Sequence, residues 1–107
     1  MQKKTTTKPE ILPSLSYVIV RSLNAGCFAG ELVGRDQNTV ILQSSRRLWY
    51  WAGAASLSQL AMEGTSKPNE CKFPPAVTRH EILGVCEILS VTDKARISIE
   101  GTPVWRS

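Results

Sequence analysis

The chain has 107 residues, 42% of them hydrophobic and 21% charged, which is the size and composition of one folded domain. Lysines in residues 1–14 carry part of the formal net charge of +4, so the rest of the chain is close to neutral. A local anion pocket is therefore favoured over a broad polyanion-binding surface. No apolar run approaches the ~20 residues that span a membrane, and no apolar signal core begins the sequence, so we expect a cytoplasmic protein without a membrane partner.

The first predicted elements are a flexible leader and a β-hairpin. Residues 1–14 are polar and show almost no apolar periodicity, so we interpret them as a leader before one globular domain, residues 15–107. Residues 17–22 are rich in β-branched side chains and predict a strand. Residues 24–26 (Asn-Ala-Gly) form a turn sequence, and residues 27–33 predict the second strand.

A third strand is predicted at residues 39–43, and after a break at residues 44–45 the sequence Arg-Arg-Leu-Trp-Tyr-Trp occupies residues 46–51. As a strand this run would divide its side chains between two faces, with Arg47, Trp49 and Trp51 on one and Arg46, Leu48 and Tyr50 on the other. Arginine pairs with phosphate and aromatic rings stack on bases, so the run is a candidate for binding a nucleotide-like anion. The alternative is a core strand with buried tryptophans.

A short amphipathic helix is predicted at residues 54–63, where Leu57, Leu60 and Ala61 recur at helical spacing. The small residues 53–56 form its first turn. Free backbone N–H groups there would make a phosphate cradle directly after the aromatic run. Alternatively, the small residues only allow the helix to pack closely on the sheet, and both interpretations stay open.

The rest of the chain predicts more strands and a second helix. After a loop at residues 65–75, residues 76–91 indicate a long, interrupted strand region. Thr92 is the expected N-cap of a helix that Gly101 ends, and residues 104–106 form a last short strand or tail. Together these elements predict an α+β fold, an antiparallel β-meander of about 5–6 strands with two short helices packed on it.

The sequence does not indicate metal or catalytic chemistry. Cys27, Cys71 and Cys86 are widely spaced without a CxxC pair, and His80 is the single histidine, so we expect reduced thiols and no metal. No phosphate-binding loop, nucleophile elbow or dinucleotide fingerprint occurs, and nothing designates a base for a cysteine nucleophile. We therefore expect a binding protein without enzymatic activity and without a cofactor.

Three segments, residues 17–30, 46–60 and 71–73, resemble a family of small phage-encoded proteins, and the resemblance covers most of residues 17–100. The same segments are similar to the phage Thoeris anti-defence sponges, which sequester signalling nucleotides. The resemblance implies a β-rich homo-oligomer, a dimer or a hexamer, that binds a cyclic ADP-ribose-type messenger or a cyclic oligonucleotide between protomers without cleaving it. It also implies action in the cytoplasm of the infected host, where the free messenger falls below the level that triggers immunity.

The sequence therefore predicts a pocket around residues 46–56 that sequesters a cyclic nucleotide. Arginine would bind its pyrophosphate, an aromatic ring its adenine, and helix N-terminal amides the remaining oxygens. One alternative is an accessory protein that stacks single-stranded nucleic acid, although the small charge excess argues against a stable nucleic-acid partner. Another is a protein–protein inhibitor of a host defence factor. The candidate ligand-binding residues are Arg21, Phe28, Arg46, Arg47, Trp49, Trp51, Ser56, Gln59 and Phe73.

Overall fold

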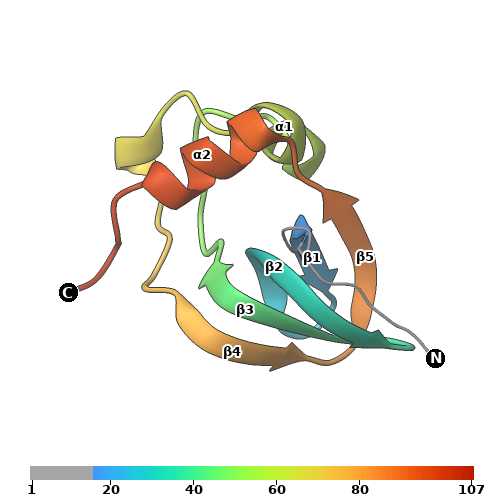
Figure 1. The fold of residues 1–107 in the computed structure, drawn as a ribbon. Coiled ribbons are helices and arrows are strands. Elements are labelled where there is room, and N and C mark those ends of the chain that lie inside the picture. Colours follow the sequence, from blue (N-terminus) through green and yellow to red (C-terminus); the bar gives the residue numbers. More distant parts are fainter. Residues whose placement is uncertain (1–15) are drawn as a thin grey trace, which may run out of the picture.

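A computed structural model describes residues 16–107, in which five strands form one antiparallel sheet beside two α-helices. The strands are β1 (Tyr17–Ser22), β2 (Gly26–Asp36), β3 (Thr39–Arg47), β4 (Val77–Ile82) and β5 (Val85–Ser90). The helices are α1 (Leu57–Glu63) and α2 (Asp93–Gly101), and a 3₁₀ turn covers Pro68–Glu70. The predicted α+β fold is confirmed (Figure 1), and the predicted leader lies outside the described residues.

The sheet is strongly curved because a tight turn joins its two edge strands. The strand order is β4-β3-β2-β1-β5, so β1 to β4 form a meander and β5 returns beside β1. Leu83 and Gly84 alone separate β4 from β5, which draws the two edges toward each other. Ser22 Oγ donates to Leu83 O over 2.7 Å, and Val85 N donates to Asn38 O over 2.9 Å. Figure 1 shows the resulting open barrel, with both helices gathered on one side.

Strand β1 is buried on both faces and separates two apolar clusters. Tyr17 and Ile19 belong to the outer cluster, which packs under the helices, whereas Val18 and Val20 belong to the inner cluster inside the curved sheet. Consecutive side chains of a strand point to opposite faces, so burial of both faces requires an unbroken apolar run. This is why residues 17–20 carry no charged side chain and only one polar group, the hydroxyl of Tyr17.

Two predicted ligand-stacking residues are part of these clusters. Phe28 fills the inner cluster and Phe73 the outer one, and both side chains are fully buried. A fully buried ring offers no face to a ligand from solvent. We therefore correct the expected role of Phe28 and Phe73 from ligand stacking to core packing.

Strand β3 continues through Ser44 and Ser45, where the sequence predicted a break. The register with β2 shifts between Ala29 and Glu31, and Ser44 has a φ of 52°, so the serines form a β-bulge opposite Gly30. A Cβ at Gly30 would lie 3.0 Å from the carbonyl oxygen of Gln43, which explains the glycine at this crossing. The predicted break is therefore a kink inside one strand.

The predicted strand at residues 46–51 is wrong beyond Arg47, where β3 ends. The chain stays beside its neighbours for a few more residues. Leu48 N donates to Cys27 O over 2.9 Å, and Tyr50 forms an isolated antiparallel bridge with Lys72. Trp51 follows this bridge and lies outside the sheet.

Both helices begin at a side-chain cap. Ser56 Oγ accepts a hydrogen bond from Gln59 N at the start of α1, and the predicted cap Thr92 accepts one from Ala95 N at the start of α2. Helix α1 is shorter than the predicted residues 54–63, because the small residues before Ser56 stay outside it. Within residues 16–107, no helix is long and apolar enough to cross a bilayer.

Candidate functional site

The two arginines of the predicted binding run point to opposite faces of β3. Arg46 turns toward α2 and is only 6% exposed, whereas Arg47 lies on the other face and is exposed. This separation follows from the extended backbone, which alternates side chains between faces. The two predicted phosphate-binding groups therefore serve different parts of the molecule.

Arg46 donates hydrogen bonds to three backbone carbonyls. Its Nη1 donates to Ile99 O over 2.8 Å, its Nη2 to Phe73 O over 3.1 Å and its Nε to Pro74 O over 3.3 Å. Ile99 lies in the last turn of α2, and the residue four positions later is Pro103, which has no N–H to donate to the Ile99 carbonyl. Thr102 N donates to this carbonyl over 3.3 Å, and Arg46 adds a second, shorter hydrogen bond and places positive charge at the negative end of the helix dipole.

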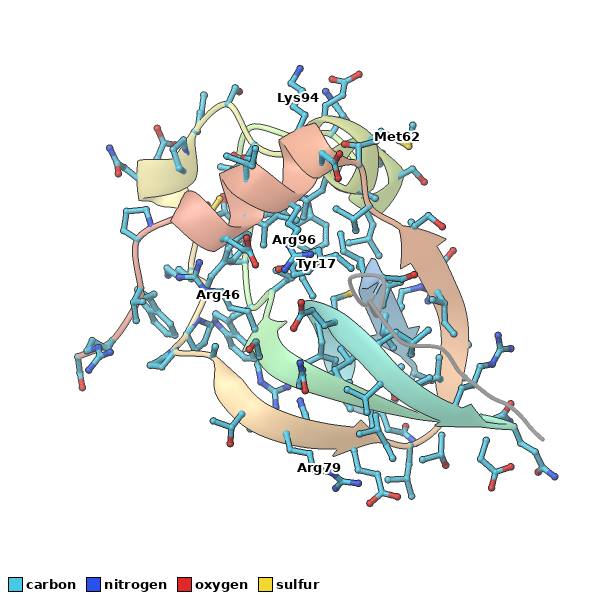
Figure 2. The ribbon with its side chains drawn as sticks, in the orientation of Figure 1. Tyr17, Arg46, Met62, Arg79, Lys94 and Arg96 are labelled. Carbon is cyan, nitrogen blue, oxygen red and sulfur yellow. The ribbon has the colours of Figure 1, made fainter. Side chains whose placement is uncertain are left out.

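This geometry gives Arg46 a structural role. Figure 2 shows its side chain below α2, between the helix and the sheet. Burial lowers the pKa of its guanidinium, the change that desolvation of a cation produces. The buried contacts correct the expectation that Arg46 binds the pyrophosphate of a ligand.

Arg47 covers the open end of the inner cluster. Its guanidinium lies 4.6 Å from the centre of the Phe28 ring and donates to Ala25 O over 2.8 Å. His80 meets the same ring edge-on, with ring centres 4.7 Å apart, and its Nδ1 lies 3.0 Å from Ser45 Oγ. Burial and the positive charge of Arg47 both lower the pKa of His80. Arg47 remains an exposed cation held in a fixed position.

We expect the protein to lose stability as the pH falls below the ordinary histidine pKa of 6.5, because the pKa of folded His80 is lower. Between these two values the unfolded chain binds more protons than the folded chain, so the free energy of unfolding decreases with falling pH. This contribution is fully present above pH 6.5 and is lost as the pH falls toward the folded pKa. Urea unfolding at about pH 7.5 and about pH 5.5 should show a smaller loss in His80→Gln than in the wild type. Equal losses would contradict the assignment to His80.

One side of the predicted phosphate cradle at residues 53–56 is covered by the protein itself. A Cβ at Gly53 would lie 2.5 Å from Lys67 N, so the loop at residues 65–67 packs directly against this turn. Ser66 N donates to Gly53 O over 3.2 Å, and the Thr65 hydroxyl donates to Ala52 O. These contacts support close packing as the reason for the small residues.

Ser56 and Gln59 also have local partners. Ser56 Oγ caps α1, and Gln59 Oε1 accepts from Ala55 N over 2.8 Å. Gln59 Nε2 donates to Glu63 over 3.3 Å. The polar groups of both side chains are used in building the helix start, and we correct their expected role from ligand binding to helix capping.

A cation between two exposed aromatic rings lies where three chain segments meet. Lys72 N donates to Tyr50 O over 2.7 Å, and Trp105 N donates to Phe73 O over 3.0 Å, which aligns the C-terminal segment with the other two. The Lys72 ammonium lies 5.8 Å from the centre of the Tyr50 ring and 5.6 Å from that of Trp105. The side chains are 51% and 44% exposed, and neighbouring Trp49 is 64% exposed. We refer to Tyr50, Lys72 and Trp105 as the Lys72 surface.

Residues 15–99 match the family model of a domain of unknown function, DUF6948. The chain belongs to this family. No curated protein and no solved structure matches it. Most of the Lys72 surface lies inside the matched part of this DUF6948 protein, whereas Trp105 lies beyond it.

The remaining predicted site residues of the DUF6948 domain lie apart from one another. Trp51 is half-buried and packs against the outer cluster. Arg21 is on β1 and forms an exposed ion pair with Glu87 of β5, with Nε and Oε1 2.7 Å apart. Of the predicted residues, Arg47 and Trp49 remain exposed and without a structural role that would exclude ligand contact.

Lys72, which the sequence offers only as a residue that could flank a pocket, and Trp105 are not among the predicted site residues. One local signal was present, because Cys71 and Phe73 are apolar around Lys72, the alternation of a short strand with one face buried. No comparable signal placed Trp105 beside Lys72. Their proximity depends on the parallel bridge between Phe73 and Val104, which joins segments far apart in the sequence.

Proposed function

We propose that this protein binds an anionic nucleotide ligand without turning it over, and that the Lys72 surface is its binding face. The observation that carries the proposal is the Lys72 ammonium between the exposed rings of Tyr50 and Trp105. Aromatic side chains stack on nucleobases, each for about 1–3 kcal/mol, and an ammonium attracts phosphate. Exposed aromatic rings grouped in this way are typical of binding surfaces.

The resemblance to phage Thoeris anti-defence sponges supports a narrower form of the proposal. In this form the ligand is a cyclic nucleotide immune messenger, a cyclic ADP-ribose isomer or a cyclic oligonucleotide. A cytoplasmic phage protein would sequester it in the infected host without cleaving it. Adenine would stack on Trp105 or Tyr50, with phosphate near Lys72.

An oligomer would complete such a site. The Lys72 surface is exposed to solvent and contacts one side of a ligand, so a neighbouring protomer could cover the other side. This agrees with the homo-oligomer, a dimer or a hexamer, that the resemblance implies. Native mass spectrometry of protein from messenger-producing cells would report both the number of protomers and any retained ligand.

We expect Lys72→Ala and Trp105→Ala each to weaken nucleotide binding at least about tenfold, since each removes a charge or a stacking platform. Isothermal titration calorimetry with cyclic ADP-ribose isomers and cyclic dinucleotides measures the effect. The matched control is Lys94→Ala, an exposed lysine near the start of α2, which should bind like the wild type (Figure 2).

Three results separate the proposal from its alternatives. If Lys72→Ala and Trp105→Ala both bind the nucleotide with wild-type affinity, the proposal is wrong. Binding that strengthens with strand length and falls steeply with salt would favour a single-stranded nucleic-acid partner. A host protein that binds the wild type but not Trp105→Ala, with no nucleotide bound by either, would favour the protein–protein inhibitor.

A further inference from the structure

A small cavity lies on the other side of the C-terminal segment from the Lys72 surface. Val104 lines this cavity and pairs with Phe73, whereas the neighbouring Trp105 belongs to the Lys72 surface. Consecutive side chains of an extended segment point to opposite sides, so the two sites are distinct. The cavity has a volume of about 240 Å³, and we refer to it as the Arg46 cavity. Its walls are Tyr17, Ser44, Arg46, Ala76, Glu100 and Val104.

The Arg46 guanidinium has no carboxylate partner within residues 16–107, where its acceptors are three backbone carbonyls. A guanidinium carries five N–H donors, so one N–H on each terminal nitrogen is left over. Burying a cation without a counter-ion is costly, and carbonyl dipoles offset only part of that cost. A ligand carboxylate in the cavity would complete the hydrogen bonding of Arg46 and neutralise its charge.

Two further polar groups line the same cavity. Tyr17 is only 7% exposed, and its hydroxyl has no hydrogen-bond partner in the described part of the chain. Burial raises the pKa of Tyr17 to about 12, so the hydroxyl is a neutral donor near neutral pH. Glu100 is exposed and uses Oε2 to pair with Arg96 Nε at 3.2 Å, which leaves its other oxygen to accept.

Figure 2 shows Tyr17, Arg46 and Arg96 close together between α2 and the sheet. The guanidinium of Arg96 lies 4.7 Å from the centre of the Tyr17 ring, which fixes that ring as a wall of the cavity. Arg96 also pairs with Glu31 at 3.0 Å, so its charge is shared between two carboxylates. The negative charge of Glu100 is therefore only partly neutralised at the cavity. This disfavours a ligand that carries only negative charge and favours one that carries a positive and a negative group.

We propose that the Arg46 cavity binds a small zwitterion, an α-amino acid with an apolar side chain. The ligand carboxylate accepts from Arg46 and Tyr17, and its ammonium donates to Glu100. Ala76 and Val104 supply the apolar wall for its side chain. A volume of about 240 Å³ is below the usual size of pockets for drug-sized molecules, which limits the occupant to one of about amino-acid size.

L-leucine is the probe, titrated into the ¹⁵N-labelled full chain and followed by amide chemical shifts. The changes should centre on Ser44, Ala76, Glu100 and Val104, and the amide of Lys72 should move little. Leucinamide lacks the carboxylate and N-acetyl-leucine lacks the ammonium, so each should bind at least about tenfold more weakly. No binding of leucine up to about 50 mM, or equal binding of the three compounds, would overturn the proposal.

Two variants that keep the core intact test the assigned groups. Glu100→Gln should weaken leucine binding about tenfold and leave N-acetyl-leucine binding unchanged, a difference that a purely structural role would not produce. Tyr17→Phe keeps the ring under Arg96 and should weaken both ligands about threefold. The control Glu87→Gln, on β5, should bind leucine like the wild type. Unchanged leucine binding in both test variants overturns the assignment, and none of these results depends on nucleotide binding.

Discussion

Replacing Arg46 by methionine should lower the free energy of unfolding by about 3 kcal/mol. Methionine fills most of the volume of the arginine stem, so the loss reports the hydrogen bonds of the guanidinium. Pro74 O loses the donor that Arg46 Nε provides. Ile99 O still accepts from Thr102 N over 3.3 Å, and Phe73 O still accepts from Trp105 N over 3.0 Å. Each of these carbonyls therefore keeps one hydrogen bond. Methionine carries no charge, so the variant avoids the desolvation cost of a buried guanidinium. This offsets part of the lost stability.

The matched control is Arg47→Met, the same change at the adjacent residue. Its guanidinium is exposed and contributes one hydrogen bond and a contact with the Phe28 ring, so we expect a loss of about 1 kcal/mol or less. Urea unfolding of both variants measures the difference. A larger loss in Arg47→Met than in Arg46→Met would refute the structural role of Arg46.

Replacing Gly53 by alanine should destabilise the fold by about 3 kcal/mol or more. The φ of 81° is unfavourable for alanine, at roughly 1–2 kcal/mol. The added Cβ would also lie 2.5 Å from Lys67 N and 2.7 Å from Ser66 N. Backbone atoms cannot turn away as a side chain can, so the whole loop at residues 65–67 has to move and loses its hydrogen bonds to residues 52–53.

Gly101→Ala is the control for this change. It lies at the end of α2, and nothing stands within 4 Å of a Cβ added there. Alanine favours the helix over glycine, so Gly101→Ala should be neutral or stabilising by up to about 1 kcal/mol. Thermal and urea unfolding of both variants provide the comparison. If Gly53→Ala lowers the free energy of unfolding no more than Gly101→Ala does, the prediction is wrong and the loop at residues 65–67 adjusts without loss of stability.

The sequence predicts well those elements that depend on neighbouring residues. The apolar run at residues 17–20 predicts β1, residues 24–26 predict its turn, and Thr92 predicts the start of α2. Each signal lies within a few residues of the element that it specifies. The β-bulge is an intermediate case, because Ser44 and Ser45 are visible in sequence but Gly30 on the neighbouring strand decides that they bend the strand instead of ending it.

The candidate site depends on contacts that no local pattern contains. In the sequence, Arg46 beside two tryptophans is interpreted as a phosphate ligand. Its role is decided by the carbonyl of Ile99, 53 residues later, to which its Nη1 donates. From the sequence, Trp105 is interpreted as part of a short strand or tail. In the structure, the Phe73–Val104 bridge places it against Lys72. In both cases the deciding partner is distant in sequence and comes from the packing of the outer cluster.

The pairing of β5 with β1 has a consequence for the order of folding. Strands β1 to β4 are joined by sequential connections, but the second edge of β1 is completed by β5, and Arg21 meets Glu87 across 66 residues. Such a non-local pairing bears a larger chain-entropy cost than a hairpin, which makes it a late step. Until residues 85–90 are in place, the most apolar strand of the protein has an open edge, the feature that makes partly folded chains prone to aggregate.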